Sequence, residues 1–142
     1  MSFREKSAWV TLITLIVLAV AFELGVHSPW TLSPTPGGRE VQLLLHSIVV
    51  FVTVEILAYV VLRLHSPRDA RTPKDERERL IEIRSRAIAY YVFTALALGG
   101  TFVALHVVGS NQFGLAWLVL WSFIASQIVN YGLRIFYYRR GF

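Results

Sequence analysis

The sequence predicts an all-α polytopic membrane protein, a bundle of four transmembrane helices, from three observations. The 142-residue chain is 55% apolar and 16% charged, whereas soluble domains are typically roughly 45–50% apolar and about 25% charged. The apolar residues gather in four blocks, each close to the roughly 20 residues that an α-helix needs to cross a bilayer. The positively charged residues fall almost entirely on one side of the resulting topology. A single transmembrane domain therefore accounts for residues 1–142.

The four blocks predict the positions of the transmembrane helices. Helices that are hydrophobic on all sides over this length are typical of bilayer spans, because a helix satisfies its backbone polar groups internally. Basic residues precede the first block, as in a signal peptide, but the block is longer than the apolar region of a usual signal peptide and no A-x-A-like cleavage site follows it. We expect it to be retained. The predicted helices cover about residues 8–26, 42–64, 87–108 and 113–136.

The distribution of charge predicts the orientation of the chain. Of the 14 lysines and arginines, all but Arg39 fall on the side that the N-terminus, the segment 65–86 and the C-terminus share. Cytoplasmic loops carry such an excess, which places both termini in the cytoplasm and the loop 27–41 outside it. The net charge of +5 is then a topology signal, with some attraction to anionic membrane lipids, and no nucleic-acid partner is expected. The predicted location is a bacterial inner membrane.

The third helix is predicted to begin well before the bilayer. Thr72 is a suitable N-cap, Pro73 suits the first helical position, and Asp75 and Glu76 complement the helix dipole. Nothing interrupts the pattern before Val108, so we expect one helix of about 36 residues, or about 54 Å at the α-helical rise. Its first turns are predicted to extend into the cytoplasm.

The charged start of this helix has two interpretations. Asp75–Arg79 and Glu82–Arg86 are i,i+4 pairs of favourable polarity, as expected of a solvated juxtamembrane helix. The alternative is a surface on which a partner protein docks. The residues of this predicted docking surface are Asp75, Glu76, Arg77, Glu78 and Arg79.

The D-E-R-E run at residues 75–78 leads directly into the third membrane helix. It resembles the corresponding run in small, uncharacterised four-helix prokaryotic integral membrane proteins that carry a juxtamembrane acidic-basic motif. The resemblance is confined to this stretch of the chain. It implies the four-helix topology and no particular chemistry.

Ionisable residues in the outer half of the predicted bundle form a candidate metal or haem site. Imidazole and carboxylate groups are ligands of zinc, copper and iron, and His46 and His106 can also ligate a haem axially if they face each other. The alternative is that these histidines lie near the interface and bond to water and headgroups, since no tight motif such as H-x-x-x-H is present. The candidate ligands are Glu23, His27, His46 and His106.

Glu55 lies near the middle of the second helix. An ionisable group at that depth in the bilayer is energetically costly, so it is a candidate functional residue. One interpretation is a neutral acid that holds helices together through hydrogen bonds to polar neighbours. The other is a group that exchanges protons or binds a ligand in a cavity. The polar residues expected at its depth are Thr14, Tyr59, Thr94, Ser122, Ser126, Gln127 and Asn130.

The spacing of His46 and Glu55 predicts an assembly. The two residues are nine positions apart, which places them on opposite faces of a helix. Both cannot point toward the axis of an isolated four-helix bundle. Either a second protein surface flanks this helix, or one of the two residues faces lipid or headgroups. We expect the first case, a homo-oligomer or membership of a larger membrane complex.

Three functions remain open from the sequence. The preferred one is a non-enzymatic binding or accessory membrane subunit with an intramembrane polar cluster around Glu55. The alternatives are a haem- or metal-binding redox protein that uses His46 and His106, and a small proton-coupled transporter that acts as an oligomer with Glu55 as the exchanging site. No nucleophile elbow, paired-carboxylate site or phosphate loop is visible, and the chain has no cysteine. We therefore predict no catalytic residues.

Overall fold

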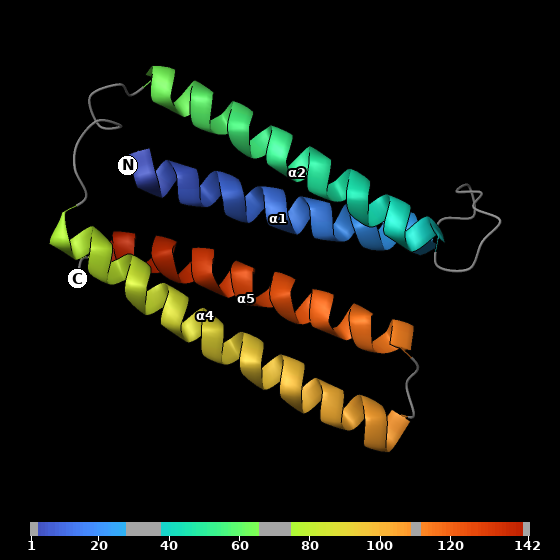
Figure 1. Ribbon diagram of the computed structural model, residues 1–142. Coiled ribbons are helices and arrows are strands. Elements are labelled where there is room, and N and C mark those ends of the chain that lie inside the picture. Colours follow the sequence, from blue (N-terminus) through green and yellow to red (C-terminus); the bar gives the residue numbers. More distant parts are fainter. Residues whose placement is uncertain (1–2, 28–37, 66–74, 109–111, 141–142) are drawn as a thin grey trace. The chain divides into compact units, whose positions relative to one another are not determined.

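The computed structural model describes residues 3–27, 38–65, 75–108 and 112–140, which form four long helices (Figure 1). These are α1 (Phe3–His27), α2 (Gly38–His65), α4 (Glu76–Val103) and α5 (Gln112–Arg140), and a π-helical turn, η1 (Ala104–Val108), continues α4. The predicted all-α class with four helices is confirmed, and each helix is long and apolar enough to cross a membrane.

The helices are longer than the apolar blocks from which they were predicted. α1 begins at Phe3 and so includes Arg4, Glu5 and Lys6, which lie before the first predicted span. Charged residues of this kind are good helix formers, and Glu5 in the first turn complements the helix dipole. The apolar block therefore marks the part of each helix that suits lipid, whereas backbone hydrogen bonding extends the helix beyond it.

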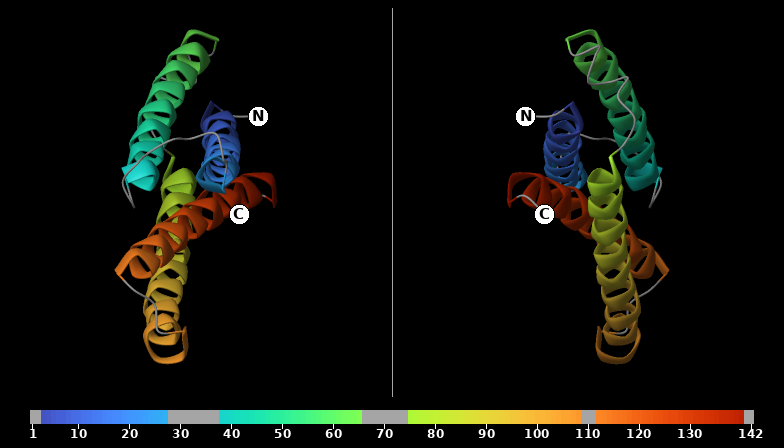
Figure 2. Two further views of the ribbon diagram at one scale, coloured as in Figure 1. Left: turned by 90° about the vertical axis from the view of Figure 1, so that its right-hand side faces the viewer. Right: turned by 90° about the vertical axis from the view of Figure 1, so that its left-hand side faces the viewer.

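The chain divides into two compact units, Met1–Thr72 and Pro73–Phe142. The first holds α1 and α2, and the second holds α4, η1 and α5. In each unit the two helices lie side by side and run in opposite directions, which Figure 1 and Figure 2 show from three sides. Each unit is thus a helical hairpin.

The register of the first hairpin is set by contacts toward both of its ends. Thr11 of α1 lies opposite Glu55 of α2, with 2.8 Å between Oγ1 and Oε2. Toward the connection, a Cβ atom placed on Gly25 would lie 3.5 Å from the methyl groups of Leu43, so the Leu43 side chain lies against α1 at this glycine.

The second hairpin keeps one antiparallel register over most of its length. Gly100 of α4 lies against Leu118 of α5, where an added Cβ would come within 2.9 Å of the leucine Cδ1. The rings of Phe93 and Phe123 meet edge to face with 6.5 Å between centroids. The buried residues of α4 recur at i, i+4 and i+8, which places them on one face of the helix. They are Ile81, Ser85 and Ala89.

The start of α4 corrects the predicted cap. Asp75 has an extended backbone and is the N-cap of a helix that begins at Glu76, so the predicted start at Pro73 was wrong. Asp75 and Glu78 form a capping box, in which the Asp75 N–H donates to Glu78 Oε2 at 3.3 Å. This reciprocal arrangement satisfies two backbone donors at the start of the helix. Thr72 and Pro73 lie outside the described residues.

The other end of α4 follows the prediction, with one local change. The helical pattern continues to Val108, but its last five residues form the π-helical turn η1. The N–H of Ala104 approaches two carbonyl groups, those of Gly100 and Thr101. Such turns insert an extra residue into a helix and reorient the side chains that follow, and His106 lies within this turn.

Candidate functional site

Glu55 forms a polar contact between the two helices of the first hairpin. Its Oε2 atom lies 2.8 Å from the Thr11 hydroxyl, and the same hydroxyl lies 3.1 Å from the Ser7 carbonyl oxygen one turn back on α1. Thr11 is buried, with 4% of its surface exposed. Glu55 Oε1 is also buried and has no hydrogen-bond partner in the described part of the chain.

Thr11 is the neighbour of Glu55 that the sequence pattern did not reveal. The sequence predicted contacts from Glu55 to Tyr59 and to polar residues of the third and fourth helices, because they lie at a similar depth. The spacing of the two residues from the connection could have indicated this contact. Thr11 lies almost as far before the end of α1 at His27 as Glu55 lies after the start of α2 at Gly38. Antiparallel pairing about the connection therefore brings these two residues together.

Tyr59 occupies a different environment from the one expected. Its side chain is 48% exposed, and its ring lies beneath the guanidinium group of Arg63, with 6.0 Å to the ring centroid. A cation over an aromatic face is a favourable electrostatic contact. Tyr59 therefore interacts toward the basic end of α2.

The hydroxyl groups predicted to line an intramembrane cluster bond to their own helices. Thr94 Oγ1 donates to the Tyr90 carbonyl at 2.9 Å. Ser122 Oγ donates to the Leu118 carbonyl at 2.7 Å, and Ser126 Oγ donates to the Phe123 carbonyl at 2.8 Å. Hydroxyl groups in helices commonly satisfy themselves in this way, so they need no partner across the bundle.

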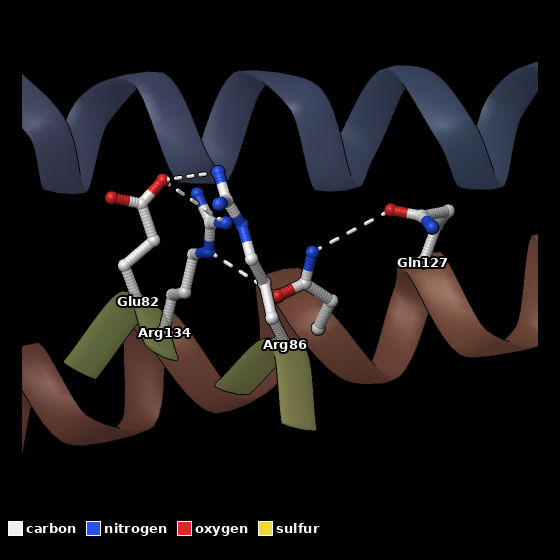
Figure 3. A network of polar contacts seen from close by, with 5 residues as sticks. Glu82, Arg86, Gln127 and Arg134 are labelled. Atoms are coloured by element: carbon white, nitrogen blue, oxygen red, sulfur yellow. Dashed lines mark hydrogen bonds and ion pairs between the residues drawn. The ribbon is translucent and has the colours of Figure 1, made fainter. Parts of the chain in front are cut away.

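Gln127 and Asn130 belong to a polar network in the second hairpin (Figure 3). The Asn130 amide donates to Gln127 Oε1 at 3.5 Å and accepts from Arg134 Nε at 3.3 Å. The Arg134 guanidinium in turn lies 3.6 Å from Glu82 Oε1 on α4, and Arg86 lies 2.6 Å from the same oxygen. The Glu82–Arg86 pair confirms the predicted i,i+4 interaction. The network links α4 and α5 toward their charged ends.

The two candidate haem ligands each bond to the preceding turn of their own helix. His46 Nδ1 lies 2.7 Å from the Gln42 carbonyl, and His106 Nδ1 lies 3.0 Å from the Phe102 carbonyl, with its ring stacked on Phe102. A carbonyl oxygen only accepts, so each Nδ1 carries a hydrogen in this contact, and Nε2 points away from it. Nε2 is also a usual metal-ligating nitrogen of histidine.

The candidate ligands are distributed over both units. Glu23 and His46 belong to the first hairpin and His106 to the second, while the side chain of His27 lies outside the described residues. Within the described ranges, no group of three or more histidine, aspartate or glutamate side chains is placed to hold a metal ion.

The predicted docking surface at the start of α4 has two kinds of residue. Asp75 and Glu78 form the capping box, so their polar groups serve the helix start. Glu76, Arg77 and Arg79 are exposed. Asp75 is exposed as well, so a partner at this surface would meet the charges of all four exposed residues.

Comparison with known proteins adds no relative to these observations. No family model matches the chain, and no curated protein and no solved structure matches it.

Proposed function

We propose that this integral membrane protein is a non-enzymatic binding or accessory subunit, built from two helical hairpins, each of which is held together by polar contacts between its own two helices. The observation that carries the proposal is the way the polar residues near mid-membrane are used. The side chains of Thr94, Ser122 and Ser126 bond within their own helices, and Thr11 and Glu55 bond across one hairpin. The first three residues thus satisfy their own hydroxyl groups, and the Thr11–Glu55 bond joins two packed helices.

Such contacts add modestly to the stability of a hairpin in lipid. A hydrogen bond between transmembrane helices contributes about 1 kcal/mol. The Thr11–Glu55 bond acts between α1 and α2, and the Glu82–Arg134 pair acts between α4 and α5. Each hairpin therefore has its own polar contact between helices. This packing role accounts for these polar residues without a catalytic one.

We propose that two copies of the chain contact each other in the membrane through the apolar surface of α2. No residue of the spanning part of α2 is buried, although Glu55 reaches across to α1. His46 is exposed on the same helix, and a polar ring on a lipid-facing surface is unfavourable without a neighbour. A second copy of the chain, placed against the face that carries His46, would cover both the apolar residues and the imidazole.

Single-cysteine cross-linking in native membranes tests this assembly, because the chain has no cysteine of its own. Leu57→Cys places a thiol on α2 at a side chain that is 59% exposed, and Ala19→Cys places one at a position that is 8% exposed. We expect oxidation to yield a cross-linked dimer from Leu57→Cys and monomer from Ala19→Cys. Monomer from both variants, together with a monomeric mass in native mass spectrometry, would reject the homo-oligomer.

The cofactor alternative has a separate test. Absorption spectroscopy and metal analysis of the purified protein are expected to show neither a Soret band nor stoichiometric metal. A band or bound metal that is lost on replacing His46 or His106 by alanine would replace the proposed function with a redox or metal-binding one.

A further inference from the structure

The Thr11 hydroxyl has two oxygen neighbours and only one hydrogen to donate. Its Oγ1 atom lies 2.8 Å from Glu55 Oε2 and 3.1 Å from the Ser7 carbonyl oxygen. The Ser7 carbonyl can only accept a hydrogen bond. If Glu55 is ionised, its Oε2 can also only accept, and the two acceptors must then share the single Thr11 hydrogen, which weakens both contacts.

We infer that Glu55 is a proton-binding site that holds a neutral carboxyl group in this structure. In that state the Glu55 O–H donates to Thr11 Oγ1, and the Thr11 hydroxyl donates to the Ser7 carbonyl. Both contacts are then hydrogen bonds, and each oxygen keeps the role that its chemistry allows. The separation of 2.8 Å between Glu55 and Thr11 is ordinary for an O–H···O bond.

The second carboxyl oxygen independently supports the neutral form. Glu55 Oε1 is buried and has no hydrogen-bond partner in the described residues. An ionised carboxylate would leave negative charge on this oxygen without a donor, which is costly away from water. In the neutral acid, Oε1 is a carbonyl oxygen, and leaving it unpaired costs much less.

The charged and titratable groups of this hairpin give Glu55 no counter-ion. α1 carries no charged residue between Lys6 and Glu23, and α2 carries none other than Glu55 between Glu40 and Arg63. The two other titratable groups in that part of α2 are His46, nine positions away and bonded to its own helix, and Tyr59, whose ring lies against Arg63. Glu55 makes no ion pair in the part of the chain that the structure describes.

This inference is independent of the proposed assembly, since it concerns contacts inside one hairpin. The proposed ligand of Glu55 is a proton, and Thr11 is the residue that positions the acid. In both hydrogen bonds the donor lies on the Glu55 side, so they run from the Glu55 O–H to the Thr11 hydroxyl and from that hydroxyl to the Ser7 carbonyl of α1.

Infrared difference spectroscopy of the full-length protein in lipid vesicles at neutral pH tests the inference. Subtracting the spectrum of Glu55→Gln from that of the unchanged protein is expected to leave the carbonyl stretch of one protonated carboxylic acid. Glutamine has the size of the neutral acid and can donate to Thr11 from its amide, so this variant is suited to fold. A difference spectrum that contains only carboxylate bands would overturn the inference.

A matched pair of threonine variants examines the hydrogen bond itself without changing the acid. Thr11→Val removes the proposed acceptor, whereas Thr53→Val removes a hydroxyl of the same hairpin that donates to the Val49 carbonyl at 2.8 Å. We expect the acid band to shift in Thr11→Val and to stay in place in Thr53→Val. An acid band that is unmoved by Thr11→Val would overturn the role of Thr11 as its partner.

Discussion

Arg134 of α5 lies 3.6 Å from Glu82 of α4, and this ion pair joins the two helices of the second hairpin toward their charged ends. Both side chains are largely covered, with 17% and 18% of their surfaces exposed. Arg134 also donates to Asn130 and lies over the ring of Tyr131, at 5.1 Å from its centroid. Arg86 Nη2 lies 2.6 Å from the same Glu82 oxygen, Oε1. The Glu82 carboxylate therefore pairs with two arginines, Arg86 on its own helix and Arg134 on the other helix.

The first prediction is that Glu82 and Arg134 are energetically coupled. In a double-mutant cycle with Glu82→Gln and Arg134→Gln, we expect a coupling of about 1 kcal/mol, because the pair is partly covered and supported by neighbouring hydrogen bonds. The measurement is the thermal or denaturant stability of the purified protein in detergent. Arg86→Gln is the control: its side chain is 65% exposed, so its loss should cost less than about 0.5 kcal/mol. Additive effects of Glu82→Gln and Arg134→Gln would contradict the prediction.

The second prediction concerns the residue that starts α4. Asp75→Ala removes the N-cap and one half of the capping box, which we expect to cost about 1 kcal/mol and to fray the first turn. Hydrogen exchange at residues 76–79 should then be faster. Thr72→Ala is the matched control, because the sequence alone favoured Thr72 as the cap. Faster exchange in Thr72→Ala than in Asp75→Ala would show that the helix begins at Pro73 and that Thr72 is its N-cap.

The sequence predicts that four helices exist, but it does not predict which side chains form contacts between them. Four apolar blocks predict four helices because each is close to the thickness of a bilayer, and a long helix is the simplest structure that satisfies its backbone there. The charged ends of α1 and α5 were missed as helical, because hydropathy marks the lipid-facing length and does not detect where backbone hydrogen bonding ends.

The partner of Glu55 could not be chosen by depth alone. Several residues share its level in the membrane, and a hydrogen bond depends also on which helices are neighbours and on their rotation. The register of the first hairpin decides in favour of Thr11. Arg134 illustrates the same limit, since as a basic residue near a helix end it counted only toward topology, whereas the structure pairs it with Glu82.

The third prediction is the orientation of the chain in the membrane. Because the sequence has no cysteine, Ser33→Cys and Ser66→Cys each create a single thiol, one in the predicted outer loop 27–41 and one in the predicted cytoplasmic segment 65–86. A membrane-impermeant maleimide applied to intact cells should label Ser33→Cys, and it should label Ser66→Cys only after the membrane is permeabilised. The reverse pattern would show that the basic segment lies outside, against the positive-inside rule.

The fourth prediction compares two adjacent glycines of α4. A Cβ atom added to Gly100 would come within 2.9 Å of Leu118 Cδ1 and 3.0 Å of Cδ2, whereas one added to Gly99 would meet nothing within 4 Å. Both glycines lie in the same helical turn, so the backbone gain from alanine is nearly the same at either position. We therefore expect Gly100→Ala to be less stable than Gly99→Ala by about 1 kcal/mol, the usual cost of slight overpacking.

The contact with Leu118 also predicts how this difference should disappear. In a Leu118→Ala background the obstructing methyl groups are absent, so Gly100→Ala and Gly99→Ala should have equal stability. Thermal denaturation of the four proteins in one detergent measures both comparisons, and the non-additivity isolates the contact between α4 and α5. If the difference between the two glycine variants persisted without Leu118, the close approach of the helices at Gly100 could not be its cause, and the antiparallel register of the second hairpin would need revision.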